Sequence, residues 1–594
     1  MMRLKKLFIT ALFLCVLFAC KKFNDNYNAL LNNPSAASTD AASADLYLNN
    51  LELSMAVNDP NLATGKFFSG TDIVGNIIGV ADFGSQLVRM EALATGNTYL
   101  NAFNPGNFED IWQTAYTNIF KTANTLIPLA EEKKQYTHAG IARVLKAYTM
   151  ITMVDLFGDV PYSEANMGIT IPNPKADSGR SIYAAAISLL DSAITELALP
   201  VLQSAAPSND IYFNANATNW ITLAKTIKLK AYVQTRLVDP TAADKITQLV
   251  NDNDLINTSD QDFVLAFSSH NQSPDSRHPK YINNYGTDGG ALDYIGNYFM
   301  FLLDEDKGIV DPRIRYYLYR QCIDINNDPR LPNQTTLQFA IPCLFRSYPP
   351  NYPPTSNPNI GFTTTPYCIV NTGYWGRDHL NNEGIGPDQL LRTTYGVYPA
   401  AGAFDADQNA PVGQGAGREK GANGNGIFPM WLSSFTYFAK AEAALTLSTP
   451  GDPMSLMIQG ISASFDKVSS FPTAVGYSLP TSDTSMLITE TRKQNYINKV
   501  KALYLAAGTA DEKLNVIMKE YYLAAWGNGL EPYNSYRRTG KPENMQPALG
   551  PSPGFFIRSF FYPPSYIDFN QNATQKPGTN VKVFWDNNPD NFVQ

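Results

Sequence analysis

Apolar residues recur at three- and four-residue steps in several long stretches of the chain, the spacing that lays one buried stripe along an α-helix. The clearest stretch spans residues 137–157, and its stripe consists of Ile141, Val144, Leu145, Tyr148 and Ile151. Gly158 follows, and glycine readily adopts the left-handed backbone that ends helices. Pro161 has no amide hydrogen with which to continue a helix. We therefore predict a helix that ends at Gly158 and leads into a tight turn.

The same spacing predicts further helices that fall in pairs. The pairs are 108–127 with 138–157 and 181–198 with 218–237, and the carboxy half adds helices at 430–447, 491–507 and 511–526. Paired helices that stack on their neighbours are typical of tetratricopeptide arrays, although the chain has no strict 34-residue period. We predict a mostly α fold of tetratricopeptide-like helical hairpins with long irregular loops. Trp112 and Trp220 lie at helical spacing among other apolar residues, and we assign both to the core.

Residues from about 260 to 428 break the helical pattern. This segment is rich in Pro, Gly, Asn and Tyr, and residues 349–354 read Pro-Pro-Asn-Tyr-Pro-Pro, which excludes a helix interior and a central strand. Its many aromatic side chains need either burial or a ligand. Because long loops on a rigid scaffold commonly carry binding residues, we expect the ligand site in this loop-rich insert.

The first 19 residues have the order of an export signal, with a basic head followed by an apolar run from Leu7 to Phe18. This run is too short to span a bilayer, and no later run reaches the roughly 20 apolar residues that a membrane helix needs. Leu17-Phe18-Ala19-Cys20 resembles a lipobox, apart from Phe18, where a small residue is usual. We predict that residues 1–19 are removed and that Cys20 is lipidated. The alternative is an ordinary secreted protein with a chance cysteine.

Residues 20–43 are polar and read as a flexible tether between the lipid and the folded protein. Several acyl chains on Cys20 suffice for stable membrane anchoring. No clear boundary follows residue 43, so we predict one binding domain over residues 44–594. An acidic patch directly after the cysteine would favour display on the cell surface, and here only Asp25 is acidic.

Charge and cysteine content exclude several classes of function. The 594-residue chain has a formal net charge of −8, whereas nucleic-acid binding demands clusters of Lys and Arg. Cys322, Cys343 and Cys368 can form at most one disulfide among themselves. With four histidines in all and no zinc-like spacing, we predict neither a metal site nor a cofactor.

Four short motifs follow the lipobox in a fixed order. They are Arg143-x-x-x-Ala147-Tyr148 with Phe157-Gly158-Asp159-Val160-Pro161-Tyr162, Asp311-Pro312-Arg313, Ala439-x-Ala441-Glu442-Ala443, and Tyr536-Arg537-Arg538-Thr539-Gly540. Each is weak alone, but together they resemble the signature of the SusD/RagB-like outer-membrane lipoproteins of the Bacteroidetes. The resemblance implies a nutrient-binding protein that sits as a lid on a SusC-like TonB-dependent outer-membrane transporter. It also implies an oligosaccharide or a peptide as ligand, and we favour a carbohydrate.

The densest cluster of functional side chains lies in residues 373–384. Tyr374 and Trp375 offer flat apolar faces for a sugar ring, while Arg377, Asp378 and Asn381 offer hydrogen bonds to hydroxyls. This mixture is typical of a ligand site. The alternative is a structural loop in which Arg377 and Asp378 pair within the fold and Trp375 closes the surface.

Two weaker candidate contacts complete the predicted site. Tyr285 and Asp288 belong to a polar, glycine-containing loop, and Phe68 lies roughly where the resemblance places part of the ligand site. A glycosidase would need two paired carboxylates that the sequence does not single out, and no Gly-x-Ser-x-Gly elbow is present. We therefore predict no enzyme. The main alternative is a surface adhesin or structural lipoprotein, which would lack a neighbouring gene for a SusC-like transporter.

Overall fold

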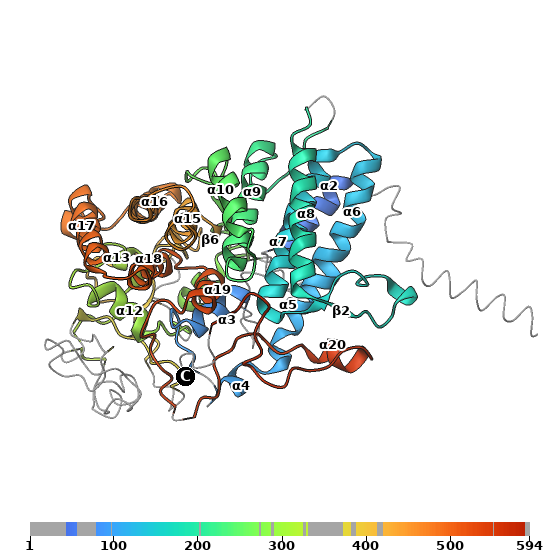
Figure 1. Ribbon diagram of the computed structural model, residues 1–594. Coiled ribbons are helices and arrows are strands. Elements are labelled where there is room, and N and C mark those ends of the chain that lie inside the picture. The colour runs from blue at the N-terminus through green and yellow to red at the C-terminus, as the bar shows by residue number, and fades with distance from the viewer. Residues whose placement is uncertain are drawn as a thin grey trace, which may run out of the picture.

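The computed structural model describes residues 43–55, 79–94, 96, 98–200, 204–272, 275–286, 290–324, 328–330, 367, 372–381, 388–412, 420–550 and 552–588. These residues form a mostly helical protein, as predicted (Figure 1). One continuous hydrophobic core contains residues from Ala44 to Trp585.

Long helices stand side by side in the amino-terminal half (Figure 1). The helices of this half, long and short, are α2 (Ala44–Ser54), α3 (Val80–Leu87), α4 (Tyr99–Ala102), α5 (Glu109–Gln113), α6 (Lys121–Glu132), α7 (Tyr136–Phe157), α8 (Gly179–Leu197), α9 (Ala217–Thr235) and α10 (Ala242–Asp252). Helix α6 packs on α7, α7 on α8, and α8 on α9. Consecutive helices therefore form the hairpins that the sequence predicts.

Helix α7 lies at the centre of this stack, and almost its whole circumference is buried. It ends at Gly158, which has a φ of 75° and whose amide donates to Val154 O at 2.8 Å. The next residues form β1 (Val160–Pro161), which pairs antiparallel with β2 (Ala176–Asp177). Asp159 Oδ1 accepts a hydrogen bond of 2.8 Å from the amide of Gly179, the first residue of α8. The predicted turn thus joins two packed helices.

The helix predicted over residues 108–127 is present but irregular. Between α5 and α6 lies the π-helical segment η2 (Thr114–Phe120). A π-helix bonds each residue to the fifth residue along. Such segments are rare in proteins, but those that occur are often found at functional sites. Trp112, in α5, and Tyr116, in η2, lie side by side, with ring centroids 5.0 Å apart.

The carboxy-terminal half contains α15 (Ser433–Leu447), α16 (Pro453–Ala474), α17 (Glu490–Ala506), α18 (Ala510–Ala524), α19 (Leu530–Thr539) and α20 (Pro564–Phe569). Helix α16 packs on α15 but is absent from the predicted set, although its buried residues Met457, Ile461, Phe465, Val468 and Phe471 recur at helical spacing. Gly460 permits a close approach, because a Cβ there would lie 3.0 Å from the ring of Phe438.

The loop-rich segment carries short elements between these halves. They are β3 (Phe263–Ala266), α11 (Pro279–Tyr285), α12 (Asn297–Asp304), α13 (Ile314–Tyr317), β4 (Leu318–Tyr319), β5 (Thr394–Tyr395) and β6 (Ile427–Trp431). Strand β3 pairs antiparallel with β6, and β4 pairs with β5. The pairing of β3 with β6 brings the two ends of the segment together.

Two of the sequence motifs meet in one buried ion cluster. Glu442 on α15 accepts from Arg236 Nε at 2.8 Å and from Arg538 Nε at 2.7 Å, and its side chain is completely buried. Burial alone would raise the pKa of the Glu442 carboxyl, but Arg538 and Arg236 outweigh burial and lower the pKa to about 2. The motifs thus join α15 and α19 to the end of α9.

We expect Glu442→Gln to lower the free energy of unfolding by about 3–5 kcal/mol at pH 7, because it leaves two buried guanidinium groups without a counter-charge. Urea unfolding measures the loss. The matched control is Glu490→Gln, since the Glu490 side chain is 89% exposed and its ion pair contributes about 0–1 kcal/mol. Equal effects of the two variants would contradict this account.

The same cluster predicts that the folded protein loses stability at acidic pH. The pKa of Glu442 is lower in the folded protein, about 2, than its ordinary value of 4.5. Its stabilisation is therefore complete above pH 4.5 and is lost as the pH falls towards 2. We expect the wild type to lose stability over this range by more than Glu442→Gln does, as urea unfolding at several pH values will measure.

Candidate functional site

The five residues predicted to form the ligand site between positions 374 and 381 lie beneath the surface. Tyr374 is 4% exposed, and Trp375, Arg377, Asp378 and Asn381 are each 1% exposed. In this structure their side chains are packed within the protein and offer no open face to solvent.

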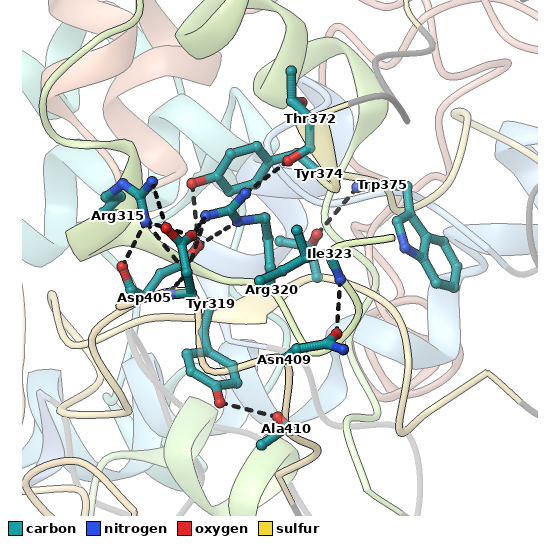
Figure 2. A network of polar contacts seen from close by, with 12 residues as sticks. Arg315, Tyr319, Arg320, Ile323, Thr372, Tyr374, Trp375, Asp405, Asn409 and Ala410 are labelled. Atoms are coloured by element: carbon teal, nitrogen blue, oxygen red, sulfur yellow. Dashed lines mark hydrogen bonds and ion pairs between the residues drawn. The ribbon is translucent and has the colours of Figure 1, made fainter. Parts of the chain in front are cut away.

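Tyr374 belongs to a buried polar network between the β4 and β5 regions (Figure 2). Its hydroxyl donates to Asp405 Oδ2 at 3.2 Å, and Arg320 Nε donates to the same oxygen at 2.6 Å. The Arg320 guanidinium also lies over the Tyr374 ring, 4.7 Å from its centroid, and Arg320 Nη1 donates to Thr372 O at 2.8 Å. Burial, together with the Asp405 carboxylate, raises the pKa of Tyr374 well above its ordinary value. These contacts fix the aromatic ring in place.

Trp375 is held by its backbone, and its indole points away from the Arg320 network (Figure 2). Its amide donates to Thr393 Oγ1 at 3.1 Å, and its carbonyl accepts from Thr393 N at 3.1 Å. The indole ring is packed inside the fold, and within the described part of the chain its Nε1 has no hydrogen-bond partner.

Arg377 and Asp378 join this segment to the start of α12. Arg377 N donates to Ile295 O at 3.0 Å, and the Arg377 guanidinium lies 4.8 Å from the centroid of the Tyr294 ring. Asp378 Oδ1 accepts from Asn297 Nδ2 at 3.1 Å and, from another part of the chain, from Gln546 Nε2 at 2.7 Å. Burial raises the pKa of Asp378.

Tyr285 is also buried, and its hydroxyl donates to Tyr395 O at 2.5 Å and accepts from Ala403 N at 3.0 Å. Phe68, Asp288 and the predicted lipidation site Cys20 lie outside the described residues. Ligand contact by any of these residues, and by residues 374–381, stays a prediction.

Two further expectations concern cysteine and metal. Cys322 is buried, whereas Cys343 and Cys368 lie outside the described residues, so a disulfide among the three stays a prediction. Within the described ranges, no three His, Cys, Asp or Glu side chains are arranged to hold a metal ion. A search of the same ranges finds no helix that is long and apolar enough to cross a membrane.

An open pocket of about 280 Å³ lies elsewhere, between η2, the β1–β2 connection and α20. Figure 1 shows α5, β2 and α20 together at one end of the molecule. Trp112, Tyr116, Tyr566 and Phe569 supply its aromatic lining, and prolines, an alanine and amide and hydroxyl side chains supply the rest. This pocket is not evident from the sequence, because Trp112 and Tyr116 at helical spacing look the same as core residues.

Two family models match the chain. Residues 79–330 match the family described as starch-binding and associating with the outer membrane. Residues 425–583 match the family described as SusD and RagB outer membrane lipoprotein. Together the two matches cover more than half of the chain. A comparison with curated proteins finds no match.

Solved structures share the fold. A SusD homologue from Bacteroides fragilis has a TM-score of 0.62 and 15% identity, with 92% of this chain and 100% of that chain covered. A SusD/RagB family protein from Bacteroides thetaiotaomicron has a TM-score of 0.62 and 19% identity over the same shares of the two chains. A chitin-binding SusD homologue from Flavobacterium johnsoniae has a TM-score of 0.56 and 18% identity, with 86% and 95% covered. Motifs, family matches and fold agree, and the chain belongs to the SusD/RagB family.

Proposed function

We propose that this protein is an outer-membrane lipoprotein that captures an oligomeric nutrient and delivers it to a SusC-like TonB-dependent transporter. The observation that carries the proposal is the match of residues 79–330 and 425–583 to two SusD-type families within one helical fold. The descriptions starch-binding, for one family, and chitin-binding, for the relative from Flavobacterium johnsoniae, favour a glycan over a peptide as the nutrient.

The proposed mode of attachment is a lipid on Cys20, followed by the polar tether. The first described helix, α2, starts directly after the proposed tether, and the side chain of Ser43 caps it by accepting from Asp45 N at 3.1 Å. Two or more acyl chains hold such a protein stably at a membrane. In this arrangement the tethered binding domain sits as a lid on its transporter.

Affinity purification of the native protein from its own outer membrane in mild detergent tests this proposal. We expect a large TonB-dependent barrel to co-purify with the wild type. The Cys20→Ala variant should incorporate no labelled palmitate and should leave the membrane fraction, because it lacks the acylated thiol. Purification of the wild type without a barrel would contradict the delivery role and favour a free surface binder or adhesin.

We further propose that residues 374–381 support the fold of the loop-rich segment. The side chains of Tyr374, Trp375, Arg377, Asp378 and Asn381 are all buried, which favours this role. Hydrogen bonds also tie this stretch to residues 295–297, Thr393, Asp405 and Gln546. A buried polar junction of this kind specifies one arrangement of loops, since each unpaired group would carry a desolvation penalty.

Trp375→Ala separates a structural role from ligand contact. We expect it to lower the free energy of unfolding by about 3–5 kcal/mol, because it removes a fully buried ring. We expect the affinity of the folded fraction for glycan to stay the same, as calorimetric titration will measure. Leu505→Ala, at a residue 63% exposed, is the control for stability. Unchanged stability with weakened glycan binding would instead establish Trp375 as a ligand contact.

A further inference from the structure

The open pocket beside η2 is preformed by three segments that are far apart in the sequence. Tyr116, in η2, donates its hydroxyl hydrogen to Pro161 O at 2.7 Å. Asn570, which directly follows α20, donates from Nδ2 to Pro174 O at 2.8 Å. Both acceptors lie in or near the β1–β2 connection, so hydrogen bonds hold the helix, the connection and the carboxy-terminal segment around one cavity.

The aromatic side chains that line the pocket are of two kinds: deep rings that pack on one another, and the exposed ring of Phe569 at the rim. The ring of Trp112 lies 4.7 Å from that of Tyr566 and 5.0 Å from that of Tyr116, measured between centroids. Trp112 and Tyr566 are each 7% exposed, whereas Phe569 at the rim is 82% exposed. Packing therefore fixes the deep rings, while Phe569 offers a nearly free face. An apolar platform of this kind suits the C–H face of a sugar ring.

The polar lining of the pocket carries no formal charge. Asn166, Ser565 and Asn570 contribute amide and hydroxyl groups, and none of the described lining residues is Asp, Glu, Lys, Arg or His. Burial raises the pKa of Tyr566 to about 12, so its hydroxyl also stays neutral at physiological pH. The lining residues thus offer hydrogen bonds but no charged side chain to pair with a carboxylate, a phosphate or an ammonium group.

We propose that this pocket binds one or two neutral sugar units of the captured oligosaccharide. A volume of about 280 Å³ lies just below the roughly 300–1,000 Å³ of pockets for drug-sized ligands, which suits one or two rings. The rest of the oligosaccharide leaves the pocket past Phe569. This inference rests on the proposed capture of a glycan and names the chemical class and the place of contact.

The test uses the full chain labelled with 5-fluorotryptophan and fluorine NMR. Trp112 is one of six tryptophans, and its signal is assigned as the one missing from Trp112→Phe. The probes are maltohexaose, cellohexaose, xylohexaose and chitohexaose, with hexagalacturonate as the acidic counterpart. We expect at least one neutral probe to shift the Trp112 signal and hexagalacturonate to leave it unmoved.

Phe569→Ala tests the same pocket by its effect on binding affinity, because loss of an exposed ring leaves the core intact. We expect it to weaken binding of that probe roughly 2- to 10-fold, the effect of one aromatic contact. Phe555→Ala is the matched control, since Phe555 is a 54% exposed phenylalanine that does not line the pocket. Asn166→Gly removes the amide but retains the left-handed backbone, for which φ is 61° in the wild type, and should also weaken binding.

Several outcomes would overturn the inference. If a neutral probe binds while the Trp112 signal stays unmoved and Phe569→Ala keeps wild-type affinity, the glycan site lies elsewhere and the proposed function stands. Binding of hexagalacturonate alone, or of no probe, would reject a neutral-sugar pocket, whereas the transporter purification decides the proposed function separately. If Phe569→Ala abolishes co-purification of the barrel without changing glycan affinity, the pocket is a protein-docking surface.

Discussion

The buried carboxyl of Asp155 holds the carboxy-terminal segment against the central helix of the protein. From its place on α7, Asp155 accepts from Asn534 Nδ2 at 2.8 Å and from Trp585 Nε1 at 3.0 Å, and it also accepts from the hydroxyl of Tyr183 on α8. Arg537 Nη2 donates to the Asp155 carbonyl at 2.7 Å. Because a buried carboxylate without partners would carry a large desolvation penalty, these bonds specify where the last part of the chain must lie.

The course of the carboxy-terminal segment, which is held at Asp155, shapes the open pocket. The returning chain places the hydroxyl of Tyr562 2.7 Å from Asp159 O, just after the end of α7. Helix α20 then follows immediately, so Tyr566 comes to lie against Trp112. The pocket is therefore a consequence of the core: the π-helical turn supplies one wall, and the carboxy-terminal segment supplies the opposite one.

Helical spacing and helix-ending residues were sufficient to predict most of the long helices, because a buried stripe and the glycine at position 158 are local properties of the sequence. The family motifs were also informative, since Glu442 and Arg538 must occur together to satisfy a buried ion cluster. Helix α16 is absent from the predicted set although Met457, Ile461, Phe465 and Val468 recur at helical spacing, so its signal is present in the sequence.

The candidate site was harder to predict for a different physical reason. Tyr, Trp, Arg, Asp and Asn side chains are as suitable for a buried hydrogen-bonded junction as for a ligand site, and the sequence of residues 373–384 does not reveal what covers them. Phe569 presents the converse case. It is an ordinary phenylalanine in the sequence, and its significance arises only because distant segments leave it exposed beside a cavity.

The most direct measurement is cryo-electron microscopy of the native protein, isolated from its own outer membrane in the presence of the neutral oligosaccharide that binds most tightly. Our account predicts this chain seated on a TonB-dependent barrel, with density for a sugar ring against Trp112 and Tyr566. Particles of this chain without a barrel would contradict its role as the nutrient-binding partner of a transporter.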